Sequence, residues 1–143
     1  MSERERTNQR DLLYSAWHRT DAIKRYLAHR DASDCAVIDI DWCEYCRKCK
    51  QPIALVETQR SAAPPKDAAI TCALARLAGI AAYSISYRVT TDELDIDLFR
   101  VRQLVPTLGP VEDLLPEEWA RRLFEMRLEH ERTACQDPRA RVA

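Results

Sequence analysis

The fold is constrained most by one stretch, Ile53-Ala-Leu-Val-Glu-Thr-Gln59, which has the composition and the alternation of a β-strand. Four of its side chains share one face: Ile53, Leu55, Glu57 and Gln59. Downstream, residues 66–78 predict a helix, Gly79 follows its end, and residues 80–89 predict another strand. The helix is expected to bury an apolar stripe made of Ile70, Ala73, Leu74 and Leu77.

The residues upstream of this stretch predict a partner strand. Residues 36–45 alternate as well, with Asp39, Asp41 and Cys43 on one face. The short connection of residues 46–52 then predicts an antiparallel hairpin.

The outer parts of the chain predict two more helices and one more strand. Residues 11–30 have the three-to-four spacing of an amphipathic helix, and residues 96–105 alternate as a strand. Prolines predict a loop over residues 106–116, and a last helix starts at Pro116 and ends near Ala134. The order α-β-β-α-β-β-α predicts an α/β fold, a mixed four-stranded sheet flanked by helices.

Length and composition exclude several classes of protein. The chain of 143 residues is expected to form a single domain over residues 1–143, with residues 1–8 disordered and residues 136–143 as a tail. A net charge of −1 excludes nucleic-acid binding by bulk charge, and only 2 glycines exclude a glycine-rich phosphate loop. No apolar run is long enough for a membrane span and the N-terminus is charged, which predicts a cytoplasmic protein, in the host cytoplasm if phage-encoded.

The predicted hairpin brings carboxylates together. Asp39 and Asp41 on one strand and Glu57 on the next would lie on one side of it. Carboxylates that converge repel one another unless a cation neutralises them, and oxygen ligands suit Mg²⁺ or Mn²⁺. The sequence therefore predicts a divalent-cation site on the hairpin.

Three segments carry a resemblance to a known family: Ile38-Asp-Ile-Asp-Trp42, Pro52-Ile-Ala-Leu-Val-Glu57 and Ala78-Gly-Ile-Ala-Ala-Tyr83. Their order resembles the PD-(D/E)XK nuclease superfamily, in which an Asp on one strand is followed by Glu-x-Lys on its neighbour, a helix and another strand. Holliday junction resolvases and many restriction endonucleases belong to this superfamily. The resemblance covers residues 34–89, roughly 40% of the chain, and is greatest with small phage and bacterial members.

The resemblance implies a restriction-endonuclease-like fold and a Mg²⁺-dependent endonuclease, of the resolvase kind that cuts branched DNA as a homodimer. It implies Asp41 or Asp39, together with Glu57, as metal ligands, and the backbone carbonyl of Thr58 as a further ligand. Products would carry 5′-phosphate and 3′-hydroxyl ends.

The catalytic lysine of the superfamily is replaced here. Gln59 stands in its place, and Lys66, near the start of the following helix, is the displaced substitute. The alternative is a zinc-stabilised member that has lost turnover and binds nucleic acid or protein as a phage accessory or inhibitor module. Gln59 is the residue that supports this alternative.

Six cysteines are the unusual count, and three follow the spacing Cys43-x2-Cys46-x2-Cys49. Such spacing in a reducing compartment predicts zinc ligands. The favoured set is Cys46, Cys49, His130 and Cys135, with Cys43 as an alternative ligand; this set would tie the last helix to the hairpin tip. Cys35 and Cys72 are expected in the core, and the alternative is that all six are free thiols.

Basic residues gather in the N-terminal third and at the hairpin tip. They predict contacts to a DNA backbone by Arg19, Lys24, Arg25, Arg47 and Lys48. The alternative is that these residues are ordinary solvated faces.

Overall fold

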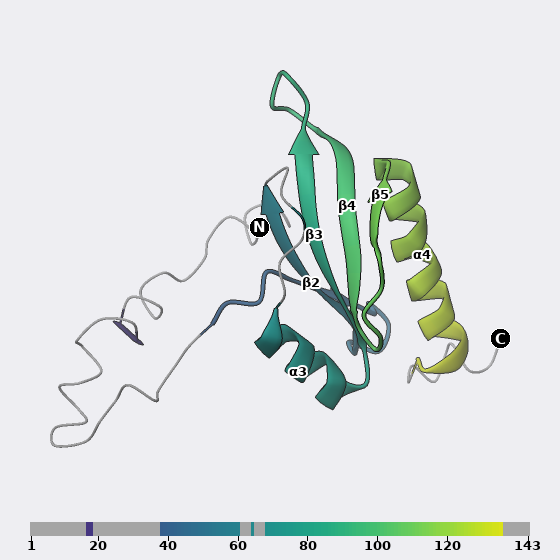
Figure 1. Cartoon of the computed structure of the whole chain (residues 1–143). Coiled ribbons are helices and arrows are strands. Elements are labelled where there is room, and N and C mark those ends of the chain that lie inside the picture. Colours follow the sequence, from purple (N-terminus) through teal and green to yellow (C-terminus); the bar gives the residue numbers. More distant parts are fainter. Residues whose placement is uncertain (1–16, 19–37, 61–63, 65–67, 136–143) are drawn as a thin grey trace, which may run out of the picture. The chain divides into compact units, whose positions relative to one another are not determined.

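The computed structural model describes residues 17–18, 38–60, 64 and 68–135 (Figure 1). Its contacts divide the chain into a unit of residues 1–39 and a unit of residues 40–143. In the first unit, Trp17 and His18 are helical and their rings meet edge-on, with centroids 6.3 Å apart. The remainder of the helix predicted for residues 11–30 lies outside the described residues, as do the segments 1–8 and 136–143.

The second unit is built on a five-stranded mixed sheet with the order β1-β2-β3-β4-β5. The strands are β1 (Trp42–Tyr45), β2 (Pro52–Arg60), β3 (Ala81–Val89), β4 (Ile96–Val105) and β5 (Val111–Leu114). Neighbours are antiparallel except β2 and β3, which are parallel and are connected by α3 (Ala69–Ala78). The predicted hairpin and the strand-helix-strand order are therefore present.

The expectation of four strands was wrong, because the predicted loop of residues 106–116 contains β5. This strand of four residues has the sequence Val-Glu-Asp-Leu and lies between two prolines, so it carries little strand signal of its own. It forms by pairing with residues 99–102 of β4. The predicted strand of residues 36–45 is also shorter than expected, and Asp39 and Asp41 precede β1 instead of lying within it.

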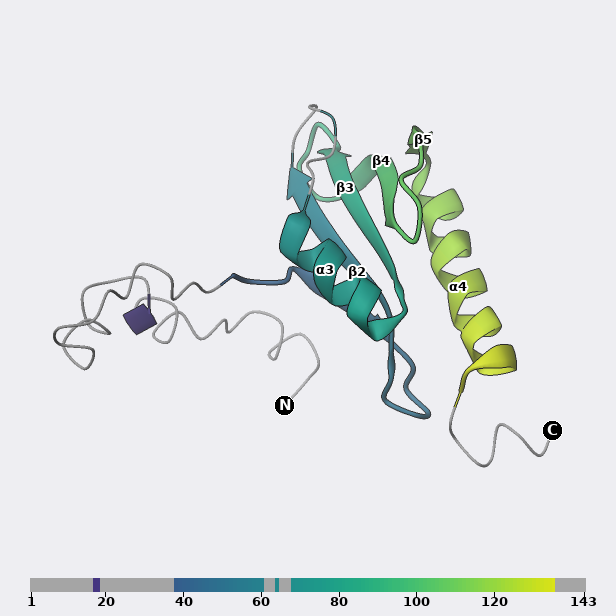
Figure 2. The same cartoon turned by 60° about the horizontal axis from the view of Figure 1, so that its bottom comes forward.

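The two helices cover opposite faces of the sheet. Leu55 and Ala82 belong to the cluster beneath α3, whereas their neighbours Val56 and Tyr83 belong to the cluster beneath α4 (Pro116–Thr133). Alternate residues of a strand point to opposite faces, so the two clusters form two separate layers of core. Figure 2 shows α3 lying across β2 and α4 running beside β5.

Helix α3 buries a different face from the one predicted. Thr71 and Ala75 are buried, whereas Ile70 and Leu74 are exposed and Leu77 is 89% exposed. Ala75 and Ala82 belong to one cluster and are both fully buried, so small side chains allow the helix to approach the sheet closely. This rotation turns Thr71 towards β2.

Glycine is required where α3 ends. Gly79 has φ 69° and ψ 33°, the left-handed conformation that glycine adopts without the usual steric cost. The backbone N–H of Gly79 donates to the carbonyl of Arg76, and that of Ile80 donates to the carbonyl of Ala75. The chain then enters β3 directly, which fixes the register of β3 beside β2.

Candidate metal centres

A carboxylate pair lies where β2 approaches its C-terminal end. Trp42 pairs with Val56, so the residue before β1, Asp41, lies beside Glu57 and Thr58. The backbone N–H of Thr58 donates to Asp41 Oδ2 at 2.9 Å, and the Thr58 hydroxyl lies 3.5 Å from the same oxygen. Trp42 Nε1 donates to the Thr58 hydroxyl at 3.1 Å. The start of β1 is thus tied to β2 through side chains as well as through the strand ladder.

Glu57 is held from the opposite side, by α3. The hydroxyl of Thr71, in the first turn of the helix, donates to Glu57 Oε1 at 2.5 Å. Thr71 is buried, and its hydroxyl therefore needs an acceptor. Thr71 was not among the site residues predicted from the sequence. The available signal was a single threonine in a helix otherwise rich in alanine and leucine.

The environment of Glu57 favours its neutral form. Burial is the main cause that raises the pKa of Glu57; the hydrogen bond from Thr71 lowers it, and the negative charge of Asp41 raises it again. The net pKa is raised. Two adjacent carboxyl groups of this kind hold either a proton or a cation between them.

The peptide of Thr58 faces the same place. In a β-strand the N–H and C=O of one residue point in the same direction, and the Thr58 N–H points to Asp41. The Thr58 carbonyl is therefore directed to that edge of β2; its predicted role as a metal ligand stays a prediction.

The other predicted members of this site bond elsewhere, belong to the unit of residues 1–39 or lie outside the described residues. Gln59 shares the sheet face of Glu57, but its Nε2 donates to the carbonyl of Pro64 at 3.0 Å. Asp39 is exposed and belongs to the unit of residues 1–39. Four basic residues lie outside the described residues: Lys66, Arg19, Lys24 and Arg25.

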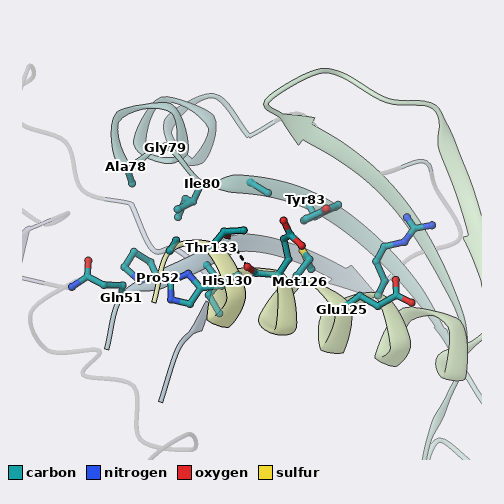
Figure 3. A pocket seen from close by; sticks show the side chains of 15 residues that line it. Gln51, Pro52, Ala78, Gly79, Ile80, Tyr83, Glu125, Met126, His130 and Thr133 are labelled. Atoms are coloured by element: carbon teal, nitrogen blue, oxygen red, sulfur yellow. Dashed lines mark hydrogen bonds between the residues drawn. The ribbon is translucent and has the colours of Figure 1, made fainter. Parts of the chain in front are cut away.

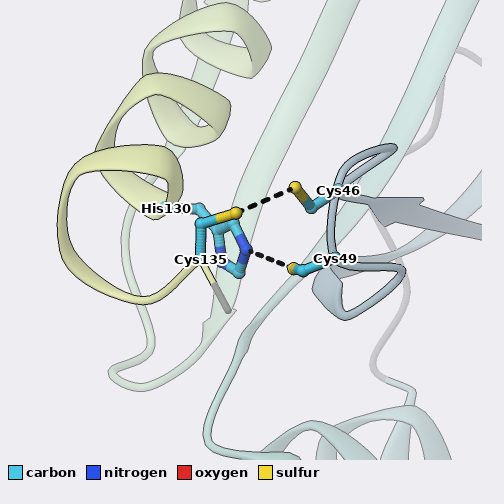
Figure 4. Close-up of side chains that lie close together, drawn as sticks. All are labelled: Cys46, Cys49, His130 and Cys135. Carbon is cyan, nitrogen blue, oxygen red and sulfur yellow. Dashed lines mark hydrogen bonds between the residues drawn. The ribbon is translucent and has the colours of Figure 1, made fainter. Parts of the chain in front are cut away.

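Four thiol and imidazole groups meet at the other end of β2 (Figure 4). Their ligand atoms all lie within 4.8 Å of one another, and they belong to Cys46, Cys49, His130 and Cys135. The sulfur atoms of Cys46 and Cys135 are 3.8 Å apart, and Cys49 Sγ is 3.2 Å from His130 Nε2. This is the predicted set, and it can hold a metal ion.

Backbone hydrogen bonds hold the two segments that carry these four ligands. The turn after β1 is closed by two bonds: the N–H of Cys46 donates to the carbonyl of Gln51, and the N–H of Lys50 to the carbonyl of Cys46. His130 lies in the last turn of α4, and the N–H of Cys135 donates to the His130 carbonyl at 2.8 Å. A salt bridge of 3.5 Å between Lys48 and Glu131 joins the same two segments.

The remaining cysteines of the described residues lie outside the four. Cys43, the alternative ligand, is exposed, and its thiol donates to the carbonyl of Glu44 at 3.6 Å. Burial, and then the charge of Glu44, raise the pKa of the Cys43 thiol. Cys72 is half-buried and packs against the core cluster beneath α3. Cys35 lies outside the described residues.

A groove of about 720 Å³ lies between α4 and the turn that follows α3 (Figure 3). Tyr83, Met126 and His130 are among the residues that line it. Neither Asp41 nor Glu57 lines it. The groove is therefore separate from the carboxylate pair.

Comparisons of the chain with protein-family models, with curated proteins and with solved structures yield no match. Among the described residues, no helix has the length and apolar character needed to cross a bilayer.

Proposed function

We propose that this chain is a metal-dependent endonuclease that hydrolyses DNA phosphodiesters at the Asp41–Glu57 pair. One observation carries the proposal: Asp41 is bonded to the Thr58 peptide, beside Glu57, on a β-β-α-β unit whose last two strands are parallel. Asp41 directly before β1, Glu57 on β2 and then the helix α3 follow the order that the resemblance to PD-(D/E)XK nucleases implied. This order is what supports the proposal.

The charge of the two carboxyl groups favours a bound cation. The pKa of Glu57 is raised by burial and by Asp41, so ionising both carboxyls without a cation is unfavourable. Mg²⁺ or Mn²⁺ would be bound by one oxygen of each carboxylate and by the Thr58 carbonyl, all hard oxygen ligands. The pair has only two side chains, so water and a phosphate oxygen would complete the coordination.

The reaction would use the cation to lower the pKa of a bound water and to stabilise the charge that develops on phosphorus. Hydroxide would attack in line, leaving a 5′-phosphate and a 3′-hydroxyl. Lys66 or Gln59 would orient that water. The Gln59 amide would first have to release the carbonyl of Pro64.

Basic residues would hold the DNA, beginning at the end of β2 opposite the acidic pair. Arg47 and Lys48 are exposed on the turn between β1 and β2, and Arg19, Lys24 and Arg25 would add to them. A second subunit would supply selectivity for branched DNA, since one chain of 143 residues is small beside a four-way junction.

The cysteine cluster would hold a structural zinc ion. A tetrahedral site with zinc–sulfur distances of 2.3 Å separates two sulfurs by about 3.8 Å. The sulfur atoms of Cys46 and Cys135 are 3.8 Å apart. Four protein ligands leave no open position for substrate, so this zinc would stabilise the fold and take no part in hydrolysis.

One observation favours a second candidate, a binding module without turnover. The Gln59 amide is bonded to Pro64, and the described residues bring no lysine to the pair. Such a protein would bind the cation and DNA and release both unchanged.

The test is cleavage of labelled duplex and four-way-junction DNA in Mg²⁺ or Mn²⁺. Asp41→Asn and Glu57→Gln should each reduce the rate by about 100-fold or more, because each removes a metal ligand. Glu44→Gln is the matched control, since Glu44 is an exposed carboxylate on β1 and should leave the rate unchanged. Cleavage that survives both site substitutions would overturn the assignment, and DNA binding without cleavage would favour the binding module.

A further inference from the structure

The four ligands of the cysteine cluster are arranged as two contacting pairs (Figure 4). Cys46 Sγ faces Cys135 Sγ at 3.8 Å, whereas Cys49 Sγ faces His130 Nε2 at 3.2 Å. Two cysteines of one metal site therefore already contact each other, while the third contacts an imidazole. This difference bears on what the cysteines do when the metal is absent.

We propose that Cys46 and Cys135 are a redox modification site: hydrogen peroxide joins them in a disulfide and expels the metal. A disulfide requires an S–S distance of about 2.05 Å, so the two sulfurs must approach by somewhat less than 2 Å. Because they start in contact, small side-chain and backbone shifts are enough.

The geometry selects this pair over the one that the sequence favours. Cys46-Arg-Lys-Cys49 has the two-residue spacing of many redox-active disulfides, which would pair Cys46 with Cys49. In the structure, Cys46 Sγ contacts Cys135 Sγ at 3.8 Å and Cys49 Sγ contacts His130 Nε2 at 3.2 Å, within a cluster whose four ligand atoms all lie within 4.8 Å of one another. Cys43 is exposed, and its thiol is bonded to the neighbouring Glu44 carbonyl.

The reaction balances with one peroxide. The thiolate of Cys135 would attack one peroxide oxygen; the O–O bond breaks, hydroxide leaves, and a sulfenic acid forms. The thiolate of Cys46 attacks that sulfur; the S–O bond breaks, a second hydroxide leaves, and the S–S bond forms. Two protons convert the hydroxides to water, and two electrons pass from the sulfurs to the peroxide. Both cysteines are buried, and exchanging their roles in the two steps leaves the balance unchanged.

Oxidation would exchange one cross-link for another. The disulfide consumes two of the four ligands, and Cys49 with His130 alone cannot retain the metal against a chelator. However, Cys46 and Cys135 come from the same two segments that the metal joins, 89 residues apart in sequence. The end of α4 would therefore remain attached to the turn after β1, and the oxidised protein would stay folded.

The test is a titration of the whole purified chain with hydrogen peroxide. Thiols are counted in denaturant, released zinc is measured with a chromogenic chelator, and the disulfide is mapped by mass spectrometry of unreduced peptides. We expect two of the six thiols to disappear, a linked peptide pair containing Cys46 and Cys135, and one zinc released per chain. Reduction by a dithiol should restore both thiols and zinc binding.

Controls separate this site from general oxidation. Cys43→Ser and Cys72→Ser should leave the mapped pair unchanged, because neither residue belongs to the cluster. A Cys46–Cys49 disulfide, a disulfide through Cys43, or loss of two thiols with zinc retained would overturn the proposal. The mapping needs no variant that might fail to fold.

The pairing rests on the geometry of the cysteines, and only the zinc release rests on the proposed function. A protein purified without zinc that still forms the Cys46–Cys135 disulfide would support the modification site and overturn the zinc assignment. Loss of DNA cleavage in Asp41→Asn does not bear on it.

Discussion

The two ends of β2 present opposite kinds of side-chain group. Before Pro52, the turn offers sulfur ligands to a cluster of four protein groups, with Cys46 and Cys135 buried. Near Arg60, Asp41 and Glu57 offer oxygen ligands from only two side chains and one peptide. A closed site of four ligands stabilises structure, whereas a site short of ligands leaves room for water and substrate. Under the proposed function, the number of protein ligands therefore distinguishes the role of the cysteine end from that of the carboxylate end.

The largest effect is expected at the cysteine end. Cys49→Ser or removal of zinc by a chelator should reduce the free energy of unfolding by on the order of 4 kcal/mol, since both remove the link between α4 and the turn after β1. Thermal and denaturant unfolding with and without zinc would measure this. Cys43→Ser is the matched control, because this cysteine lies outside the cluster. Equal stability of Cys49→Ser and the original chain would mean that this end is not a structural metal site.

A smaller effect is expected at the carboxylate end, from Thr71→Val. The substitution removes a hydroxyl bonded to Glu57 and should cost about 1.5 kcal/mol of stability. Because that bond lowers the pKa of Glu57, its loss should raise the pKa further and move Mn²⁺ binding to higher pH. Titration with Mn²⁺ at several pH values measures the shift. Thr71→Ser keeps the hydroxyl and should restore the original profile; equal profiles for valine and serine would remove Thr71 from the site.

The stability of the metal-free protein should depend on pH through Glu57, at the carboxylate end of β2. The folded-state pKa of Glu57 is raised above the unfolded value of 4.5, so the folded state binds this proton more tightly. The contribution of Glu57 to the free energy of unfolding is fully present below pH 4.5 and is lost as the pH rises through its raised pKa. Denaturant unfolding of the original chain and of Glu57→Gln should show this loss only in the former. Mn²⁺ should abolish the difference at the higher pH, and a difference that grows with pH in favour of the original chain would contradict the assignment.

The smallest effect is expected for the ion pair that lies beside the cysteines. Lys48→Ala removes the salt bridge to Glu131, and half of the Lys48 side chain is exposed. Exposed pairs contribute about 0.5 kcal/mol, so the substitution should barely change the unfolding midpoint. A loss near that of Cys49→Ser would mean that charge, and not a metal, joins α4 to the turn.

Much of the central unit could be predicted, because its signals are local. Alternation identified the strand through Glu57, the run of alanine and leucine identified α3, and Gly79 marked its end. Spacing also identified the favoured cysteine set, and the structure brings its four members together. The pairing of Asp41 with Glu57 followed from the hairpin, although Asp41 lies before the strand and not in it.

Other features could not be predicted, because they depend on distant residues. Strand β5 forms by pairing with β4, and its own four residues contain two acids. The buried face of α3 is chosen by the fit of Ala75 against the sheet, which overrides the larger apolar stripe of Ile70, Leu74 and Leu77. Thr71 was missed for this reason.

The sequence by itself determined the type of each ligand, the strand-helix-strand order and the two segments that supply the cysteine cluster, because alternation, spacing and side-chain chemistry are properties of neighbouring residues. Only the tertiary structure decided how these groups are used. It turns Thr71 to Glu57, bonds Asp41 to the Thr58 peptide and brings Cys46 into contact with Cys135. These contacts depend on packing and strand register between segments that are far apart in the chain, and no local pattern specifies either.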